Sequence, residues 1–149
     1  MFKHILITTD GSPASNKAAK AGVALASALG AKVTAYYAVE PMQPIYAEGY
    51  AFDPRVIEDI EHNARQLAQK RVDAIGKLAK TAGVPFTSMV ATADTAYEGI
   101  IDAAKKRKCD VIFMASHGRR GLSMSVWPAQ LRSLSPVPLR VRISRSLSM

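Results

Sequence analysis

The chain has 149 residues, with 20 Lys and Arg against 12 Asp and Glu, and a single cysteine. This length suits one domain, which can bury about 70% of its unfolded surface without disulfides. Cys109 cannot pair within the chain, and this favours a reducing, cytoplasmic compartment. The apolar run before residues 8–10 is too short for a signal-peptide core or a membrane span, so we expect no membrane association.

The net charge of +8 is concentrated in the last quarter of the chain. Residues 1–110 contain 14 Lys and Arg and all 12 acids, whereas residues 111–149 contain six Arg, no Lys and no acid. Three of the ten aromatic residues cluster in residues 40–52, away from these arginines, and no known DNA- or RNA-binding motif is present, which argues against a nucleic-acid partner. The three histidines have no thiol or carboxylate at ligand spacing, so no metal site is predicted.

Apolar runs alternate with helical periodicity through the chain. The sequence predicts strands over residues 4–9, 32–39, 85–90 and 110–115, and helices over residues 12–30, 53–83 and 95–108. A fifth strand is predicted near the end, where Val137, Leu139, Val141 and Ile143 alternate with more polar residues and a proline. This order is typical of βαβ units and predicts a single α/β domain with a five-stranded, mostly parallel sheet and helices on both faces.

The helices carry recognisable start and stop signals. Ser12 is placed to cap the first helix, with Pro13 at its first position and Gly30 at its end, and Thr95 with Glu98 has the spacing of a capping box. In the long second helix an apolar stripe predicts one core face and one solvated face. Its members are Ile57, Ile60, Ala64, Leu67, Ala68, Val72, Ile75 and Ala79.

Two predicted strands end in segments suited to a ligand. The first runs into Asp10-Gly11-Ser12, and the fourth runs into a loop in which Gly118 and Gly121 enclose two arginines. In an open α/β sheet the carboxyl ends of the strands line the crevice where ligands bind. We therefore expect a nucleotide site here, with the glycine loop as a phosphate-binding turn.

These segments resemble the universal stress protein family over residues 2–124. The resemblance rests on residues 2–12 with their terminal aspartate, on Val39-Glu40-Pro41 at the second strand end, and on the loop over residues 115–121. It implies a Rossmann-like fold of the adenine nucleotide alpha hydrolase type, a stress-response role, and an adenine nucleotide such as ATP or AMP, with Mg²⁺ only alongside the nucleotide. Together with the glycine loop, this resemblance indicates the following ligand-binding residues: Asp10, Val39, Ala115, His117, Gly118, Arg119 and Gly121.

The C-terminal segment, residues 125–149, departs from the family. The nucleotide-binding branch has Gly, two residues, Gly, nine residues, then Gly-Ser or Gly-Thr; the aligned positions here are Ala115, Gly118, Pro128 and Ala129. Pro128 lacks an N–H and Ala129 lacks a hydroxyl, so weak phosphate binding is predicted. Two explanations stay open: a natural branch with a basic surface, or a reading frame shifted near Val126.

The sequence therefore predicts a universal stress protein that binds an adenine nucleotide or related ligand without catalysis, with a weak ATPase as a third option. The alternative is a family member that no longer binds nucleotide and acts as a dimeric interaction module. A homodimer paired through residues 137–143 is expected, since the family pairs through its last strand. Ser116 and His117 are neighbours on an extended chain and point to opposite sides, which argues against a catalytic pair.

Overall fold

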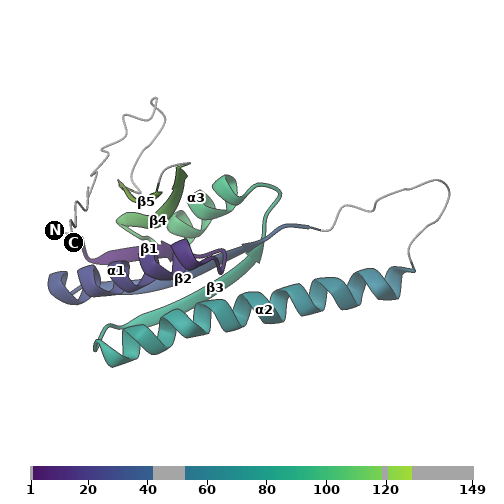
Figure 1. Ribbon diagram of the computed structural model, residues 1–149, viewed down its shortest axis with the longest axis horizontal. Coiled ribbons are helices and arrows are strands. Elements are labelled where there is room, and N and C mark those ends of the chain that lie inside the picture. The colour runs from purple at the N-terminus through teal and green to yellow at the C-terminus, as the bar shows by residue number, and fades with distance from the viewer. Residues whose placement is uncertain (1, 42–52, 119–120, 129–149) are drawn as a thin grey trace.

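The structure, a computed structural model, describes residues 2–41, 53–118 and 121–128 (Figure 1). Its strands are β1 (His4–Thr8), β2 (Lys32–Val39), β3 (Phe86–Thr92), β4 (Val111–Gly118) and β5 (Gly121–Pro128), and its helices are α1 (Pro13–Leu29), α2 (Pro54–Thr81) and α3 (Ala96–Lys106). The strands form one sheet in the order β3-β2-β1-β4-β5. β1 to β4 are parallel, and β5 runs antiparallel to β4. The predicted α/β fold with a five-stranded, mostly parallel sheet is confirmed.

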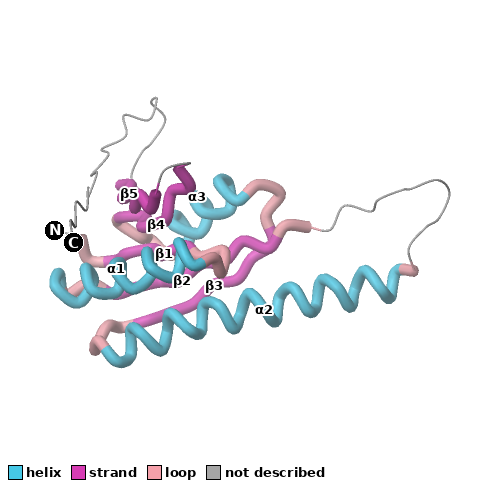
Figure 2. Tube along the Cα trace, in the orientation of Figure 1, coloured by secondary structure: helices cyan, strands magenta, loops and turns pink. Residues whose placement is uncertain are grey.

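Helices cover both faces of the sheet, and the central strand is buried between them (Figure 2). On β1, Ile5 and Ile7 pack with residues of α1 and α2, whereas Leu6 packs on the opposite face with residues of α3. All three side chains are fully buried. A continuous apolar run of this kind is what a parallel strand with two covered faces requires.

The first helix begins and ends as the sequence predicts. The backbone N–H of Ser15 donates to Ser12 Oγ at 3.2 Å, and Gly30 closes the helix in a left-handed conformation with φ of 64°. In the middle of α1, a Cβ added to Gly22 would lie 2.8 Å from Ile7 Cδ1. This glycine lets the helix approach β1 closely.

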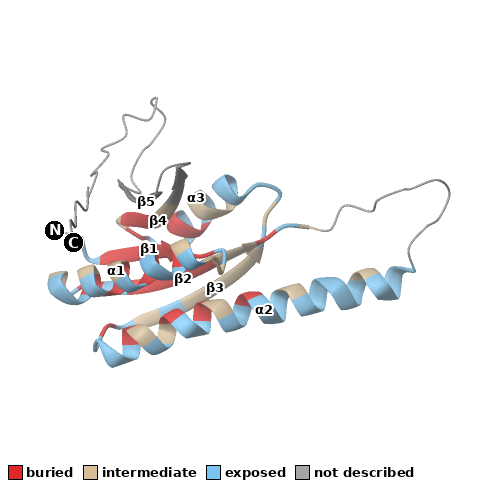
Figure 3. Cartoon of the chain, viewed as in Figure 1, coloured by how far each residue is buried: buried red, intermediate tan, exposed pale blue. Residues whose placement is uncertain are grey.

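The second helix is longer than the sheet that it covers. At 28 residues it spans about 42 Å, whereas β2, with eight residues, spans about 26 Å. Only its second half contributes buried side chains, namely Ala68, Val72, Ile75 and Ala79. The first half extends beyond the sheet and is largely exposed (Figure 3). The prediction that the whole stripe faces the core is therefore wrong for its first half, because helical periodicity does not reveal where the supporting sheet ends.

The glycine loop belongs to a β-hairpin rather than to an open turn. β4 continues to Gly118, past the predicted end at Ala115, and Gly118 pairs with Gly121 at the start of β5. β5 then runs back along β4 until Pro128 pairs with Val111. The predicted end of this strand at Ala115 is therefore wrong, whereas phosphate binding by the glycine loop stays a prediction. The alternation of Leu122, Met124 and Val126 with serines favours a strand directly after the two-residue connection.

The predicted strand over residues 137–143, and the homodimer that depends on it, lie outside the described residues. The fifth strand of the described sheet is β5 instead. None of the helices in the described ranges is long and apolar enough to span a membrane.

A buried polar ladder crosses β1, β2 and β3 near their amino ends. His4 Nε2 lies 2.7 Å from Thr34 Oγ1, which lies 2.8 Å from Thr87 Oγ1. The backbone N–H of His4 donates to Asp110 Oδ2 at 2.9 Å. Burial, with a smaller contribution from the positive charge of Lys32, lowers the pKa of His4 below its ordinary value of 6.5.

This lowered pKa predicts a stability that declines on mild acidification. The unfolded chain takes up the His4 proton as the pH falls through about 6.5, before the folded chain does, so stability is complete above that pH and is lost below it. Chemical unfolding from pH 8 to pH 5 should show this decline, and His4→Gln should flatten it. His62→Gln, at an exposed histidine, is the matched control and should leave the decline unchanged. Equal slopes for wild type and His4→Gln would contradict the assignment.

Candidate functional site

The central strand stops before its two neighbours, and this leaves a notch at the carboxyl edge of the sheet. β1 ends at Thr8, which is opposite Tyr36, while β2 continues to Val39. On the other side, β1 and β4 pair as far as Ile7 and Phe113, while β4 continues to Gly118. The topology also reverses at β1, because β2 and β3 lie on one side and β4 lies on the other. Ligands of open α/β sheets bind at such a switch point.

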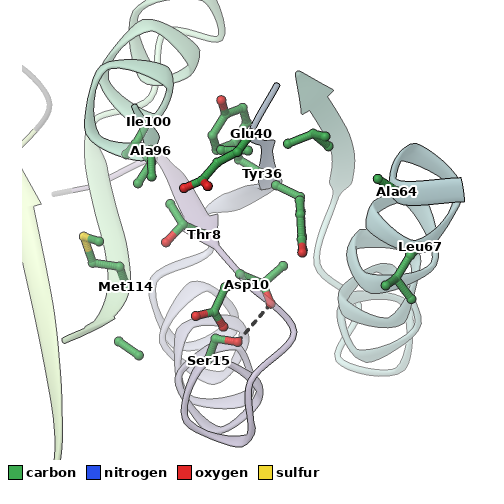
Figure 4. A pocket seen from close by; sticks show the side chains of 15 residues that line it. Thr8, Asp10, Ser15, Tyr36, Glu40, Ala64, Leu67, Ala96, Ile100 and Met114 are labelled. Atoms are coloured by element: carbon green, nitrogen blue, oxygen red, sulfur yellow. Dashed lines mark hydrogen bonds between the residues drawn. The ribbon is translucent and has the colours of Figure 1, made fainter. Parts of the chain in front are cut away.

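A pocket of about 570 Å³ occupies this notch (Figure 4). Its floor is the end of β1, its walls are the extensions of β2 and β4, and side chains of all three helices close it. Ala96 and Ile100 of α3 lie across the pocket from Ala64 and Leu67 of α2. The lining consists of Thr8, Thr9, Asp10, Ser15, Tyr36, Tyr37, Ala38, Val39, Glu40, Ala64, Leu67, Ala96, Ile100, Met114 and Ala115. This volume suits a ligand of nucleoside or nucleotide size.

The turn between β1 and α1 is held by a chain of hydrogen bonds. The backbone N–H of Gly11 donates to Thr9 Oγ1 at 3.1 Å, and Ser15 Oγ donates to Ser12 O at 3.0 Å. Because the single hydroxyl proton of Ser15 is used in this way, the 3.1 Å contact between Thr9 Oγ1 and Ser15 Oγ has Thr9 as the donor. Asp10 Oδ1 accepts from the Ser12 N–H at 2.8 Å. The floor of the pocket is therefore preorganised.

Two arginines fix α2 beside this floor. Arg71 Nη1 donates to Gly11 O at 3.3 Å, and Arg65 Nη2 donates to Thr92 Oγ1 at 2.6 Å. Gly11 has φ of 78°, and a Cβ on it would lie 2.7 Å from Arg71 Nε. Only glycine satisfies both constraints without displacing the arginine.

Two carboxylates belong to the pocket lining. Asp10 and Glu40 are both exposed and come from the ends of neighbouring strands. Carboxylates accept hydrogen bonds from the hydroxyl and amino groups of a ligand and repel its phosphates. The neutral part of a nucleotide therefore fits beside these carboxylates better than its phosphates do.

A buried phenol lies behind the pocket. Tyr36 is 1% exposed, and its hydroxyl has no hydrogen-bond partner among the described residues. Burial, assisted by the negative charge of Asp102, raises the pKa of this phenol. The hydroxyl lies against α3, where a Cβ added to Gly99 would come within 2.5 Å of it. Gly99 thus leaves the space that this hydroxyl occupies.

The structure brings together three of the residues that the sequence indicates as ligand contacts. Asp10, Val39 and Ala115 all line the pocket. The carbonyl of Val39 accepts from the Ala93 N–H at 3.1 Å. The other indicated residues lie beyond this group: His117 and Gly118 end β4, Gly121 begins β5, and Arg119 lies outside the described residues.

Pro128 lies at the opposite edge of the sheet from the pocket. It pairs with Val111 at the amino end of β4, whereas the pocket lies at the carboxyl ends of the strands. In this arrangement no helix begins within β5 to direct N–H groups at a phosphate. Ala129 lies outside the described residues.

Sequence reasoning did not single out Tyr36, Ser15 or Glu40 as pocket residues. Glu40 directly follows a predicted strand, and this position could have indicated it. Tyr36 and Ser15 look like ordinary strand and helix residues, and only the tertiary fold brings them to the pocket.

Comparisons with known proteins agree with this architecture. The model of the universal stress protein family matches residues 1–128. The chain is 32% identical over 124 residues to universal stress protein MJ0531 of Methanocaldococcus jannaschii, which covers 82% of this chain and 69% of that protein. Among solved structures, a universal stress protein from Burkholderia pseudomallei has a TM-score of 0.62 at 22% identity, over 74% of this chain and 78% of that one. A universal stress protein in complex with cAMP has a TM-score of 0.54 at 19% identity, over 74% of each chain.

The chain belongs to the universal stress protein family. The family expected from its strand-end segments is thereby confirmed. The match extends through β5 to Pro128. It therefore includes the hairpin as well as the strands around the pocket.

The close approach of Gly99 to Tyr36 predicts that substitution of this helical glycine by alanine lowers the stability of the fold. In an isolated helix Gly→Ala stabilises by about 1 kcal/mol, but Gly99→Ala should destabilise this fold by about 1 to 3 kcal/mol, because the added methyl overlaps Tyr36 and Ala93. Tyr36→Phe removes one of these overlaps and should recover part of the loss in the double variant. Chemical unfolding of the four proteins in this cycle measures the coupling. A stabilising Gly99→Ala would show that the helix does not pack in this way.

Proposed function

We propose that this chain binds an adenine nucleotide, ATP or AMP, or a related ligand in the pocket above β1, in a stress-response role in the cytoplasm and without catalysis. The observation that carries the proposal is the notch itself. It lies at the topological switch point, has the size of a nucleoside, and joins Asp10, Val39 and Ala115. Family membership and a solved relative of the same fold that holds cAMP support the class of ligand.

The chemistry of the lining supports a binding role. The Ser15 hydroxyl donates to a backbone carbonyl instead of to a base, so it is not activated as a nucleophile. The described lining consists of apolar, hydroxyl and carboxylate side chains. These groups can hold a sugar and a base, whereas hydrolysis of a phosphate requires donors at the phosphate.

We further propose that the nucleoside part of the ligand supplies most of the affinity. The carboxylates of Asp10 and Glu40 line the pocket, and Pro128 lies at the amino end of β4, away from it. A triphosphate should therefore gain little over adenosine. Mg²⁺ would enter only with a nucleotide, since the described residues contain no group of three or more potential metal ligands.

Calorimetric titration with adenosine, AMP and ATP, each with and without Mg²⁺, tests the proposal. We expect binding of adenosine and AMP, and an ATP affinity within about tenfold of that for adenosine, a difference of about 1.4 kcal/mol. Asp10→Ala should weaken binding by at least about tenfold, because a charged acceptor contributes about 1.5 to 3 kcal/mol. No binding of any of these ligands would contradict the proposed function.

Two variants serve as controls in this titration. Asp10→Asn keeps an oxygen for the Ser12 N–H and loses the charge, so it separates the effect on the turn from the effect on the ligand. The pair Pro128→Gly and Ala129→Ser restores the family residues and should leave the ATP affinity unchanged, because Pro128 is remote from the pocket. A large gain in ATP affinity from this pair would show that the segment after β4 reaches the phosphates.

A further inference from the structure

The half of α2 that extends beyond the sheet carries an exposed apolar stripe. Val56, Ile60 and Leu67 are 44%, 42% and 49% exposed, although large aliphatic side chains usually avoid water. Asn63 lies on the same stripe, between Ile60 and Leu67. Positions 56, 60, 63 and 67 thus follow at intervals of four, three and four residues, which is the spacing of a coiled-coil seam. Figure 3 shows this half of the helix standing clear of the sheet, exposed on most of its surface.

Charge is segregated along the same helix. From its cap to residue 61 it has four acids, Asp53, Glu58, Asp59 and Glu61, and one base, Arg55. From residue 65 to residue 80 it has one acid, Asp73, and five bases: Arg65 and Arg71, which donate to Thr92 and Gly11 on the sheet side, and Lys70, Lys77 and Lys80. The net charge along α2 therefore changes from negative to positive near Asn63, close to the middle of the seam.

This pattern identifies the partner that the stripe fits. We propose that α2 pairs antiparallel with α2 of a second copy of this chain, around a two-fold axis close to Asn63. The seam then places Ile60 against Leu67 of the partner subunit, and the acidic end of each helix faces the basic end of the other. A parallel pair would place acid against acid and base against base, which is repulsive.

The seam and its edge supply a specific ion pair. Lys70 follows Leu67 by three residues, so it is the next position of the seam, and Asp59 lies at the edge of the seam about three helical turns before it. In an antiparallel pair around Asn63, Lys70 comes opposite Val56 of the partner subunit, and its long side chain reaches Asp59 of the partner subunit, which is about one turn from Val56. The two-fold axis repeats this pair. Leu67 also lines the ligand pocket, so the interface adjoins it.

Sedimentation over about 10 to 500 µM measures this association, which we expect to be weak because the apolar seam is short. Ile60→Glu and Asp59→Lys should each raise the dimer dissociation constant at least about tenfold, and Lys70→Asp should restore the dimer in the Asp59→Lys background. Lys17→Asp, an equal charge reversal on α1, is the control and should have no effect. Circular dichroism should show the same helix content in all variants.

Disulfide trapping tests the orientation independently. Asn63→Cys should form a covalent dimer on mild oxidation, because the two copies of this residue meet at the axis. Val56→Cys should not cross-link to itself, but it should cross-link to Lys70→Cys in a mixture of the two proteins. Wild type is the control, since Cys109 is buried and burial raises the pKa of its thiol to about 11.

Several results would overturn the proposal. These are a monomer throughout the concentration range, a dimer insensitive to both Ile60→Glu and Asp59→Lys, or failure of Lys70→Asp to restore association. Self-linking of Val56→Cys would show a parallel pair, which also contradicts it.

Discussion

The early end of β1 is the constraint on which the site depends. The strand is fully buried between its neighbours, but after Thr8 the backbone leaves the sheet. The Thr9 N–H still donates to Tyr36 O at 3.0 Å, and the chain then turns through Gly11, which has positive φ, into the cap of α1. The neighbouring strands continue past this point. Their extensions become the walls of the pocket because nothing from β1 lies between them.

The helices stabilise this arrangement from two sides. On one face, α2 is attached by arginines to the carbonyl of Gly11 and to the hydroxyl of Thr92, so the turn and the end of β3 share one support. On the other face, α3 begins at Thr95, whose hydroxyl accepts from the Glu98 N–H at 3.3 Å. The arginine bonds thereby hold α2 beside the floor of the pocket. They also leave the first half of α2 beyond the sheet, where its apolar stripe lies next to the pocket.

Local signals in the sequence predict the first three strands and the three helices to within about two residues at most ends, as expected for elements with strong periodicity and caps. Ser12 and Gly30 bound the first helix as predicted, because capping is a local interaction. The family resemblance indicated Asp10, Val39 and Ala115, and the structure brings them together because parallel strands share a carboxyl edge. The side-chain network of Thr9 and Ser15 could not be predicted, since it depends on the turn geometry.

Two errors have a common physical origin. The sequence favoured a fourth strand that ends at Ala115 and a buried stripe along all of α2, and both expectations rest on short-range patterns. Where the fourth strand ends depends on where the next segment of the chain packs, and here β5 pairs with β4 from Gly118 back to Val111. Whether Ile60 is buried depends on how far the sheet reaches, which is set by strand length and not by the helix. Long-range geometry decided each case.

The central claim is that a nucleoside occupies the notch above β1, and backbone amide shifts in NMR spectra test it most directly. Titration with adenosine should shift the amides of Gly11, Ser15, Val39 and Ala115 together, with one dissociation constant. The amides near Lys77, on the remote end of α2, should not move. Saturable binding with shifts confined to residues away from the notch, or spectra unchanged at millimolar ligand, would contradict the account.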